Sequence, residues 1–180
     1  MNNIDMLKHV KAESLFIDDY LLQSGTLHAF IFCSTEAHAV IKNVNYDRAK
    51  ELPGVAGILT YFDIPGENQI GGIIPDEPLL AEKEVDFIGQ PIALIVAETK
   101  KIAKEASKKI EIEYEPLEVI TDPKLAKEKN YLITPPHNIS FGDVEKAFQD
   151  SDYIFTDTVV SGGQEHLYLE TQGSIAFIQE

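Results

Sequence analysis

The part of the sequence best suited to binding a ligand is the stretch 161–171, which reads Ser-Gly-Gly-Gln-Glu-His-Leu-Tyr-Leu-Glu-Thr. Its two adjacent glycines permit backbone angles that other residues avoid, and they let a partner approach the main chain closely. Three polar side chains, Gln164, Glu165 and His166, follow them directly. Because an amide, a carboxylate and an imidazole can all make hydrogen bonds, this stretch could support a ligand site.

His166 and Glu170 could in principle form an acid–base pair or share a metal ion. In a strand that rises about 3.3 Å per residue they would lie about 13 Å apart, which is too far for one ion. A helix would bring them together, but the double glycine is a poor helix start. In a strand, Gln164 and His166 share a polar face while Leu167 and Leu169 share the opposite face. The residues alone therefore favour an ordinary half-buried strand.

Elsewhere, residues that bind metals or act as nucleophiles show no recognised spacing. The histidines at positions 9, 28, 38, 137 and 166 are scattered, and Cys33 is the single cysteine, inside an apolar run. Phosphate-loop, dinucleotide-binding and serine-hydrolase motifs are absent. We therefore expect no metal site and no catalytic residue within this chain. His38 stands between two alanines, which favours a partly buried structural histidine over a catalytic one.

Composition and charge exclude several classes of partner. The chain has 180 residues, of which 15 are Lys or Arg and 30 are Asp or Glu, so its net charge is −15. This charge repels nucleic-acid phosphates and anionic lipid surfaces, and no apolar run reaches membrane-spanning length. An apolar share of 44% is enough to build a core. We expect a cytoplasmic protein with no nucleic-acid partner and no membrane association.

The elements that must support such a site form a pattern of short strands and helices. The range 27–34 is apolar almost throughout, which predicts a strand buried on both faces. Range 92–96, just after Pro91, is the best central strand, and the spacing of apolar residues predicts a helix after Thr99. Further strands are expected over 40–44, 55–61 and 111–115. The short strands indicate an α+β fold with a mixed sheet.

The chain also has a candidate linker, because residues 131–141 include the sequence Pro-Pro-His-Asn. Before it we expect a lead segment, 1–11, and a domain over 12–130. After it, 142–180 should begin with a helix capped by Asp143. Alternating residues then predict a strand over 153–160 and a return strand over 173–178, which together form a hairpin. A region of this size is too small for its own core, which indicates a truncated domain.

Several short motifs, taken together, resemble one family, the molybdenum hydroxylases typified by xanthine dehydrogenase and aldehyde oxidase. Residues 142–148 and the run 162–171 resemble the opening of that family's molybdopterin-binding domain. The motifs that resemble its α/β-hammerhead domain, in order, are Phe16-Ile-Asp-Asp19, Ser34-Thr-Glu-Ala-His-Ala39, Leu52-Pro-Gly-Val55, Asp63-Ile-Pro-Gly66, Gly89-Gln-Pro-Ile92 and Tyr114-Glu-Pro-Leu117.

The resemblance implies an enzyme that oxidises a purine, a heteroaromatic compound or an aldehyde at a molybdopterin-type molybdenum cofactor, with water as the oxygen source. Electrons leave such enzymes through iron–sulfur clusters to FAD on other domains or subunits. In the family, the glutamine of the G-G-Q run lies beside the oxo ligand of the metal. By motif match that role falls on Gln164, with Gly163 next to it. The implied partners are the remainder of the molybdopterin-binding subunit, the iron–sulfur and flavin parts, and a small-molecule substrate.

The family's glycine-rich cofactor loop and its general-base glutamate have no counterpart in these residues. Nothing at Glu165 or Glu170 matches the motif of that base, so we do not assign them the role. The isolated chain is therefore expected to be an inactive N-terminal fragment. The alternative is a complete, non-enzymatic interaction or scaffold module with a hammerhead fold. The substrate, the electron acceptor, the oligomeric state and any continuation beyond Glu180 are not specified by these residues.

Overall fold

The computed structural model describes residues 4–20, 22–167 and 172–177. The chain divides into two compact units, one of residues 23–132 and one that combines residues 1–22 with residues 133–180. Within the described parts of the chain, none of the helices has the length and apolar character needed to cross a membrane.

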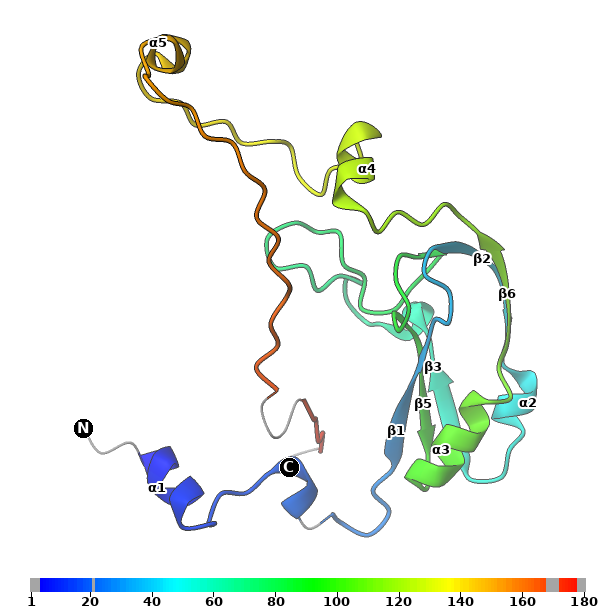
Figure 1. Cartoon of the computed structure of the whole chain (residues 1–180). Coiled ribbons are helices and arrows are strands. Elements are labelled where there is room, and N and C mark those ends of the chain that lie inside the picture. The colour runs from blue at the N-terminus through cyan, green and yellow to red at the C-terminus, as the bar shows by residue number, and fades with distance from the viewer. Residues whose placement is uncertain (1–3, 21, 168–171, 178–180) are drawn as a thin grey trace. The chain divides into compact units, whose positions relative to one another are not determined.

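The unit of residues 23–132 contains all of the strands that the structure describes (Figure 1). Its strands are β1 (His28–Cys33), β2 (Ala39–Asn45), β3 (Val55–Leu59), β4 (Glu84–Val85), β5 (Pro91–Ala97) and β6 (Glu111–Pro116). Its helices are α2 (Asp47–Lys50), the 3-10 helix η2 (Tyr61–Asp63), α3 (Lys100–Ser107) and α4 (Pro123–Glu128).

The strands form two small sheets, with the orders β1-β5-β3 and β4-β2-β6. Every described pairing is antiparallel. The α+β class is confirmed, but the expected mixed sheet is wrong, because β6 follows α3 into the second sheet instead of returning beside β5. The side chains of β6 mostly alternate between exposed and half-buried, which suits the edge of an antiparallel sheet. Parallel strands are usually buried on both faces.

Strand β5 is the centre of the first sheet, as its apolar sequence predicts. Ile95 pairs with Phe30 of β1 on one side and with Ile58 of β3 on the other. Pro91 stands at the first position of the strand, where its missing N–H interrupts no interior ladder bond. The prediction of a central strand over 92–96 is therefore confirmed.

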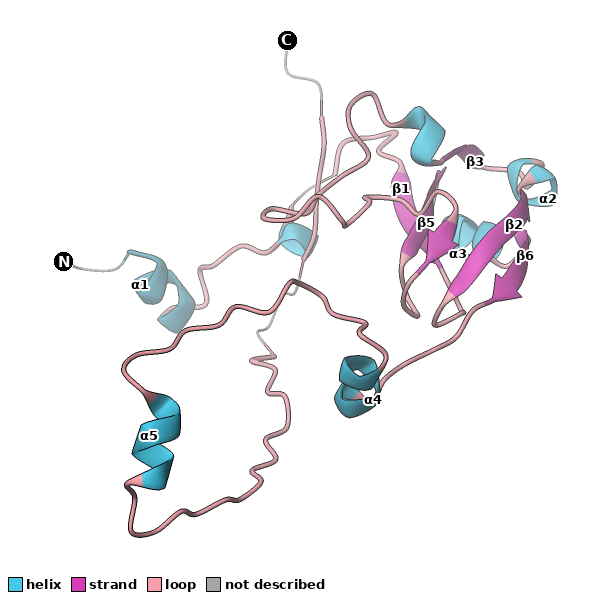
Figure 2. Cartoon of the chain, turned by 90° about the horizontal axis from the view of Figure 1, so that it is seen from above, coloured by secondary structure: helices cyan, strands magenta, loops and turns pink. Residues whose placement is uncertain are grey.

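Helix α3 packs against the β1-β5-β3 sheet and closes the larger hydrophobic core (Figure 2). The helix begins where predicted, since the Thr99 side chain accepts a hydrogen bond from the N–H of Ile102 at 3.2 Å. Ala103 and Ala106 are fully buried on its inner face, and small side chains there let the helix lie close to the sheet. A smaller cluster around Val85 and Ile92 joins the two sheets.

Strand β1 differs from its prediction. The sequence predicts burial on both faces, but the side chains alternate between half-buried and exposed, and Ile31 is 52% exposed. The reason is topological, because β1 is an edge strand of its sheet and α3 covers only one face of that sheet. A short, mostly apolar sequence does not by itself distinguish a central strand from an edge strand.

The hydroxyl of Tyr114 on β6 is buried without a hydrogen-bond partner in the described part of the chain. A buried polar atom that loses its water contacts and gains nothing in return costs free energy. We expect Tyr114→Phe to raise the free energy of unfolding by about 1 kcal/mol, because the ring stays and the unpaired hydroxyl is removed. Urea denaturation followed by circular dichroism measures this change. A loss of stability would mean that the hydroxyl has a partner in solution.

The second unit contains helix α1 (Ile4–Val10), the 3-10 helix η1 (Ile17–Asp19) and helix α5 (Val144–Gln149). The Asp143 side chain caps α5 as predicted, by accepting from the N–H of Lys146 at 2.9 Å. The predicted hairpin over 153–160 and 173–178 is wrong for the described residues, which include no strand after α5. An extended segment becomes a strand only by pairing, and none of the described residues pairs with this one.

Candidate functional site

Gln164, the predicted contact to a cofactor, lies in an exposed and irregular segment. Its neighbour Glu165 turns back on the main chain and accepts a hydrogen bond from the N–H of His166 at 3.0 Å. Leu167 has a φ of 50°, in the left-handed region, which breaks the alternation expected of a strand. The strand interpretation of this stretch is therefore wrong over 161–167. The remainder of the predicted face, at positions 168 and 170, lies outside the described residues.

Among the described residues, nothing in the packing requires glycine at Gly162 or Gly163. A methyl group built on either residue would meet no atom of the described residues within 4 Å, and neither glycine has a left-handed φ. Gly173 is different, because a methyl group there would lie 3.1 Å from the side chain of Ile17. The open space beside the main chain at Gly162 and Gly163 is compatible with close approach by a bound group.

Two of the family-like motifs, 34–39 and 89–92, are joined by backbone hydrogen bonds in the unit of residues 23–132. The N–H of Ser34 donates to the carbonyl of Gln90 at 2.8 Å, and the N–H of Gly89 donates to the carbonyl of Ser34 at 2.9 Å. Gly89 has a φ of 93°, which favours glycine. The buried Gln90 side chain also accepts from the N–H of Asp86 at 2.6 Å. These contacts therefore fix the backbone where β1 ends and β5 begins.

His38 lies beside this junction and is held at both ring nitrogens. Its Nδ1 is 2.6 Å from the backbone oxygen of Glu118, and its Nε2 is 2.8 Å from Oε1 of Glu84. The Glu118 carbonyl, and after it the Glu84 carboxylate, raise the pKa of His38 because both favour the protonated ring. The side chain is 32% exposed, so the prediction of a partly buried, hydrogen-bonded histidine is confirmed.

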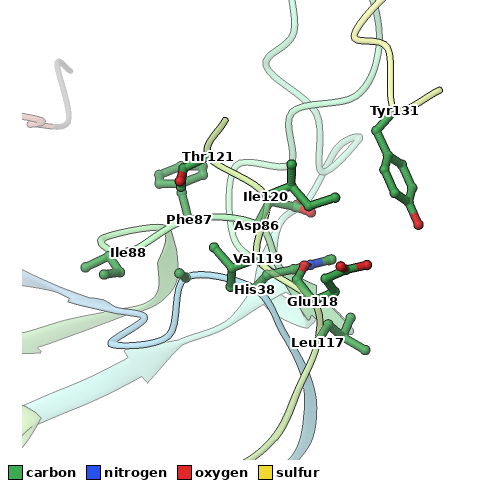
Figure 3. A pocket seen from close by; sticks show the side chains of 11 residues that line it. His38, Asp86, Phe87, Ile88, Leu117, Glu118, Val119, Ile120, Thr121 and Tyr131 are labelled. Atoms are coloured by element: carbon green, nitrogen blue, oxygen red, sulfur yellow. The ribbon is translucent and has the colours of Figure 1, made fainter. Parts of the chain in front are cut away.

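A pocket of about 640 Å³ opens next to His38 (Figure 3). Figure 3 shows the aromatic rings of Phe87 and Tyr131 and the carboxylates of Asp86 and Glu118 among the side chains around it. The pocket was not predicted from the sequence, because its walls come from separate parts of the chain, namely residues 37–38, 86–88, 117–121 and Tyr131. Gln164 and Gly163 belong to the other compact unit.

Two family models match the chain. The model described as "Aldehyde oxidase and xanthine dehydrogenase, a/b hammerhead domain" matches residues 11–118. The model described as "Molybdopterin cofactor-binding domain" matches residues 126–180, which include the G-G-Q run. The two matches follow each other in the order that the sequence motifs predict.

Curated relatives cover nearly the whole chain. Xanthine dehydrogenase of Dictyostelium discoideum is 41% identical over 168 residues, which are 93% of this chain and 12% of that protein. Aldehyde oxidase 2 of Macaca fascicularis is 41% identical over 171 residues, which are 94% of this chain and again 12% of that protein. Xanthine dehydrogenase 1 of Arabidopsis thaliana is 38% identical over 171 residues, which are 93% of this chain and 13% of that protein. The chain thus spans about an eighth of the length of these relatives.

Solved structures show the same fold. A reconstituted CO dehydrogenase from Oligotropha carboxidovorans matches with a TM-score of 0.61 and 31% identity, over 70% of this chain and 16% of the other. The aldehyde oxidoreductase of Desulfovibrio gigas matches with a TM-score of 0.56 and 30% identity, over 58% of this chain and 13% of the other. Because family models match both parts of the sequence, the chain belongs to the aldehyde oxidase and xanthine dehydrogenase family and carries its α/β-hammerhead domain.

Proposed function

We propose that this chain is part of an enzyme that oxidises a purine, a heteroaromatic compound or an aldehyde and takes the added oxygen from water. The observation that carries this proposal is the G-G-Q run at 162–164, within the segment that matches the molybdopterin cofactor-binding domain. A molybdenum cofactor, when bound, supplies the exchange of an oxygen atom and accepts two electrons from the substrate. We also propose that the enzyme is cytoplasmic.

The residues present fit such a group. Gln164 is exposed, and its amide can donate a hydrogen bond to an oxo ligand without taking part in proton transfer. The open space beside the backbone of Gly163 allows a bulky group to approach the main chain. We propose that Gln164 and Gly163 are contacts to the cofactor, and that the catalytic base belongs to a part of the enzyme outside this chain.

The proposed domain organisation is that of the same enzyme family. We propose a lead segment (1–11), a hammerhead domain (12–130), a linker (131–141) and the first part of a molybdopterin-binding domain (142–180). The first family match begins at residue 11, next to the proposed start of the hammerhead domain, whereas the second begins at residue 126, before the proposed linker. The division of the structure between residues 132 and 133 supports a linker at this place. The remainder of the subunit, iron–sulfur clusters and a flavin are the proposed partners, since electrons must leave the site after each turnover.

Isotope labelling of the product tests the proposed function directly. The protein encoded by the complete reading frame that contains this chain would be purified and its molybdenum content measured by mass spectrometry. We expect molybdenum close to one atom per subunit, and oxidation of at least one purine, N-heteroaromatic compound or aldehyde in ¹⁸O-labelled water with the label in the product. Protein from cells grown with tungstate serves as a folded, inactive control. Label derived from O₂, or a folded protein without molybdenum, would contradict the proposal.

A further inference from the structure

Three potential metal ligands converge beside the pocket in the hammerhead domain. One nitrogen of His38, one carboxylate oxygen of Glu84 and one of Asp86 all lie within 4.8 Å of one another. The sequence gives no sign of this arrangement, because His38 is 46 residues away from Glu84. The cluster lies in the unit of residues 23–132, whereas the proposed cofactor contacts belong to the other unit.

Each of the three side chains is positioned by a different part of the fold. The backbone carbonyl of Glu118 holds Nδ1 of His38 at 2.6 Å, which directs Nε2 toward the carboxylates. Glu84 is in β4, which pairs with β2 through Val40 and so has a fixed register. The N–H of Asp86 is bound by the buried side chain of Gln90 at 2.6 Å.

The orientation of His38 is the one that metal-binding histidines usually have. A histidine ligand commonly donates one ring N–H to a backbone carbonyl or a carboxylate, which fixes the ring and leaves the other nitrogen for the metal. Here Nδ1 faces the carbonyl of Glu118 while Nε2 faces Glu84 Oε1 at 2.8 Å. A divalent cation at Nε2 would take the place of the proton that Nε2 shares with Glu84, and it would contact the carboxylates of Glu84 and Asp86 at the same time.

The geometry points to a divalent-cation site formed by His38, Glu84 and Asp86, with Zn²⁺ as its best match. Two carboxylates offset the charge of a divalent ion, and one imidazole with two carboxylate oxygens is a ligand set that suits zinc. Mg²⁺ and Ca²⁺ prefer oxygen ligands and more of them than this site offers. Because Glu84 is 47% exposed, the remaining coordination positions are open to water or to a small anion from the pocket.

Calorimetric titration of the whole chain with ZnCl₂ tests this site. The protein would first be treated with a chelator and then dialysed into chelator-free buffer. We expect one Zn²⁺ per chain, and an affinity for Mg²⁺ at least about a hundredfold weaker. His38→Ala and Glu84→Gln should each weaken zinc binding by roughly 10- to 100-fold or more. Circular dichroism and urea denaturation would verify that both variants are folded.

Two control variants distinguish a built site from general attraction to an acidic protein. His137→Ala removes an exposed histidine from the candidate linker, and Glu113→Gln removes an exposed carboxylate from β6. Both should bind Zn²⁺ within about twofold of the unchanged chain, because neither residue lies in the cluster. Absence of stoichiometric binding, or equal affinity in folded Glu84→Gln, His38→Ala and the controls, would mean an adventitious ion only and would overturn the inference.

Discussion

Substitution of Gln164 by alanine is expected to lower turnover of the complete enzyme roughly 10- to 100-fold while molybdenum occupancy stays near normal. A hydrogen bond to a charged or strongly polar group contributes about 1.5 to 3 kcal/mol, which corresponds to rate changes of this size when it acts in the transition state. Occupancy should be preserved because one exposed amide is a small part of the surface that holds a large cofactor.

The matched control is Gln172→Ala, which removes the same side chain from an exposed position in the same segment. We expect its kcat within about twofold of the unchanged enzyme, as for most exposed positions away from a site. Steady-state kinetics on the complete enzyme, with metal analysis of every preparation, measures both variants. An unchanged kcat in Gln164→Ala would remove this residue from the site, and loss of molybdenum would assign it to cofactor retention instead.

Truncation of Ile95 to alanine should give the largest loss of stability in the hammerhead domain. The side chain is fully buried at the centre of β5 and belongs to the cluster that α3 covers. Truncation of an isoleucine at such a position costs about 2 to 5 kcal/mol, because the cavity cannot fully collapse. Since domains are stable by only about 5 to 15 kcal/mol, the variant should unfold at a much lower urea concentration.

Ile31→Ala is the matched control for Ile95→Ala, because it makes the same chemical change on the edge strand β1, where the side chain is 52% exposed. We expect a loss below about 1 kcal/mol. Urea denaturation of both variants, followed by circular dichroism, measures the difference. Equal losses would show that the exposed face of the sheet is covered in solution, and a small loss in Ile95→Ala would contradict the assignment of β5 as the core strand.

Local signals predicted the elements of this fold well where one residue type decides the structure. Pro91 begins β5, Thr99 caps α3 and Asp143 caps α5, each by chemistry that depends on neighbouring residues alone. The sheets were less predictable, because the partner of a strand is chosen by contacts distant in sequence. The run 27–34 could not reveal that β1 is an edge strand, and β6 could not reveal that it joins the sheet of β2.

The two candidate sites also differ in how far the sequence predicts them. Gln164 was found because its signal is a contiguous run, and its role as a cofactor contact stays a prediction. The cluster of His38, Glu84 and Asp86 was missed because its members meet only when β2, β4 and the loop before β5 are assembled. No spacing rule connects residues that the fold brings together from separate elements. A structure was needed to detect them.

We expect the exposed apolar side chains of the second unit to make this part of the chain prone to aggregation while the protein is synthesised. Phe141, Phe155 and Val159 are each at least 90% exposed, in a chain whose backbone there is unpaired. Alternating apolar residues on an unpaired backbone are prone to intermolecular β-aggregation until they are covered. The hammerhead domain has its own core, so we expect it to fold before the segment that follows it. We expect that segment to aggregate unless it is buried quickly or bound by a chaperone, which would make its synthesis a vulnerable stage of biogenesis.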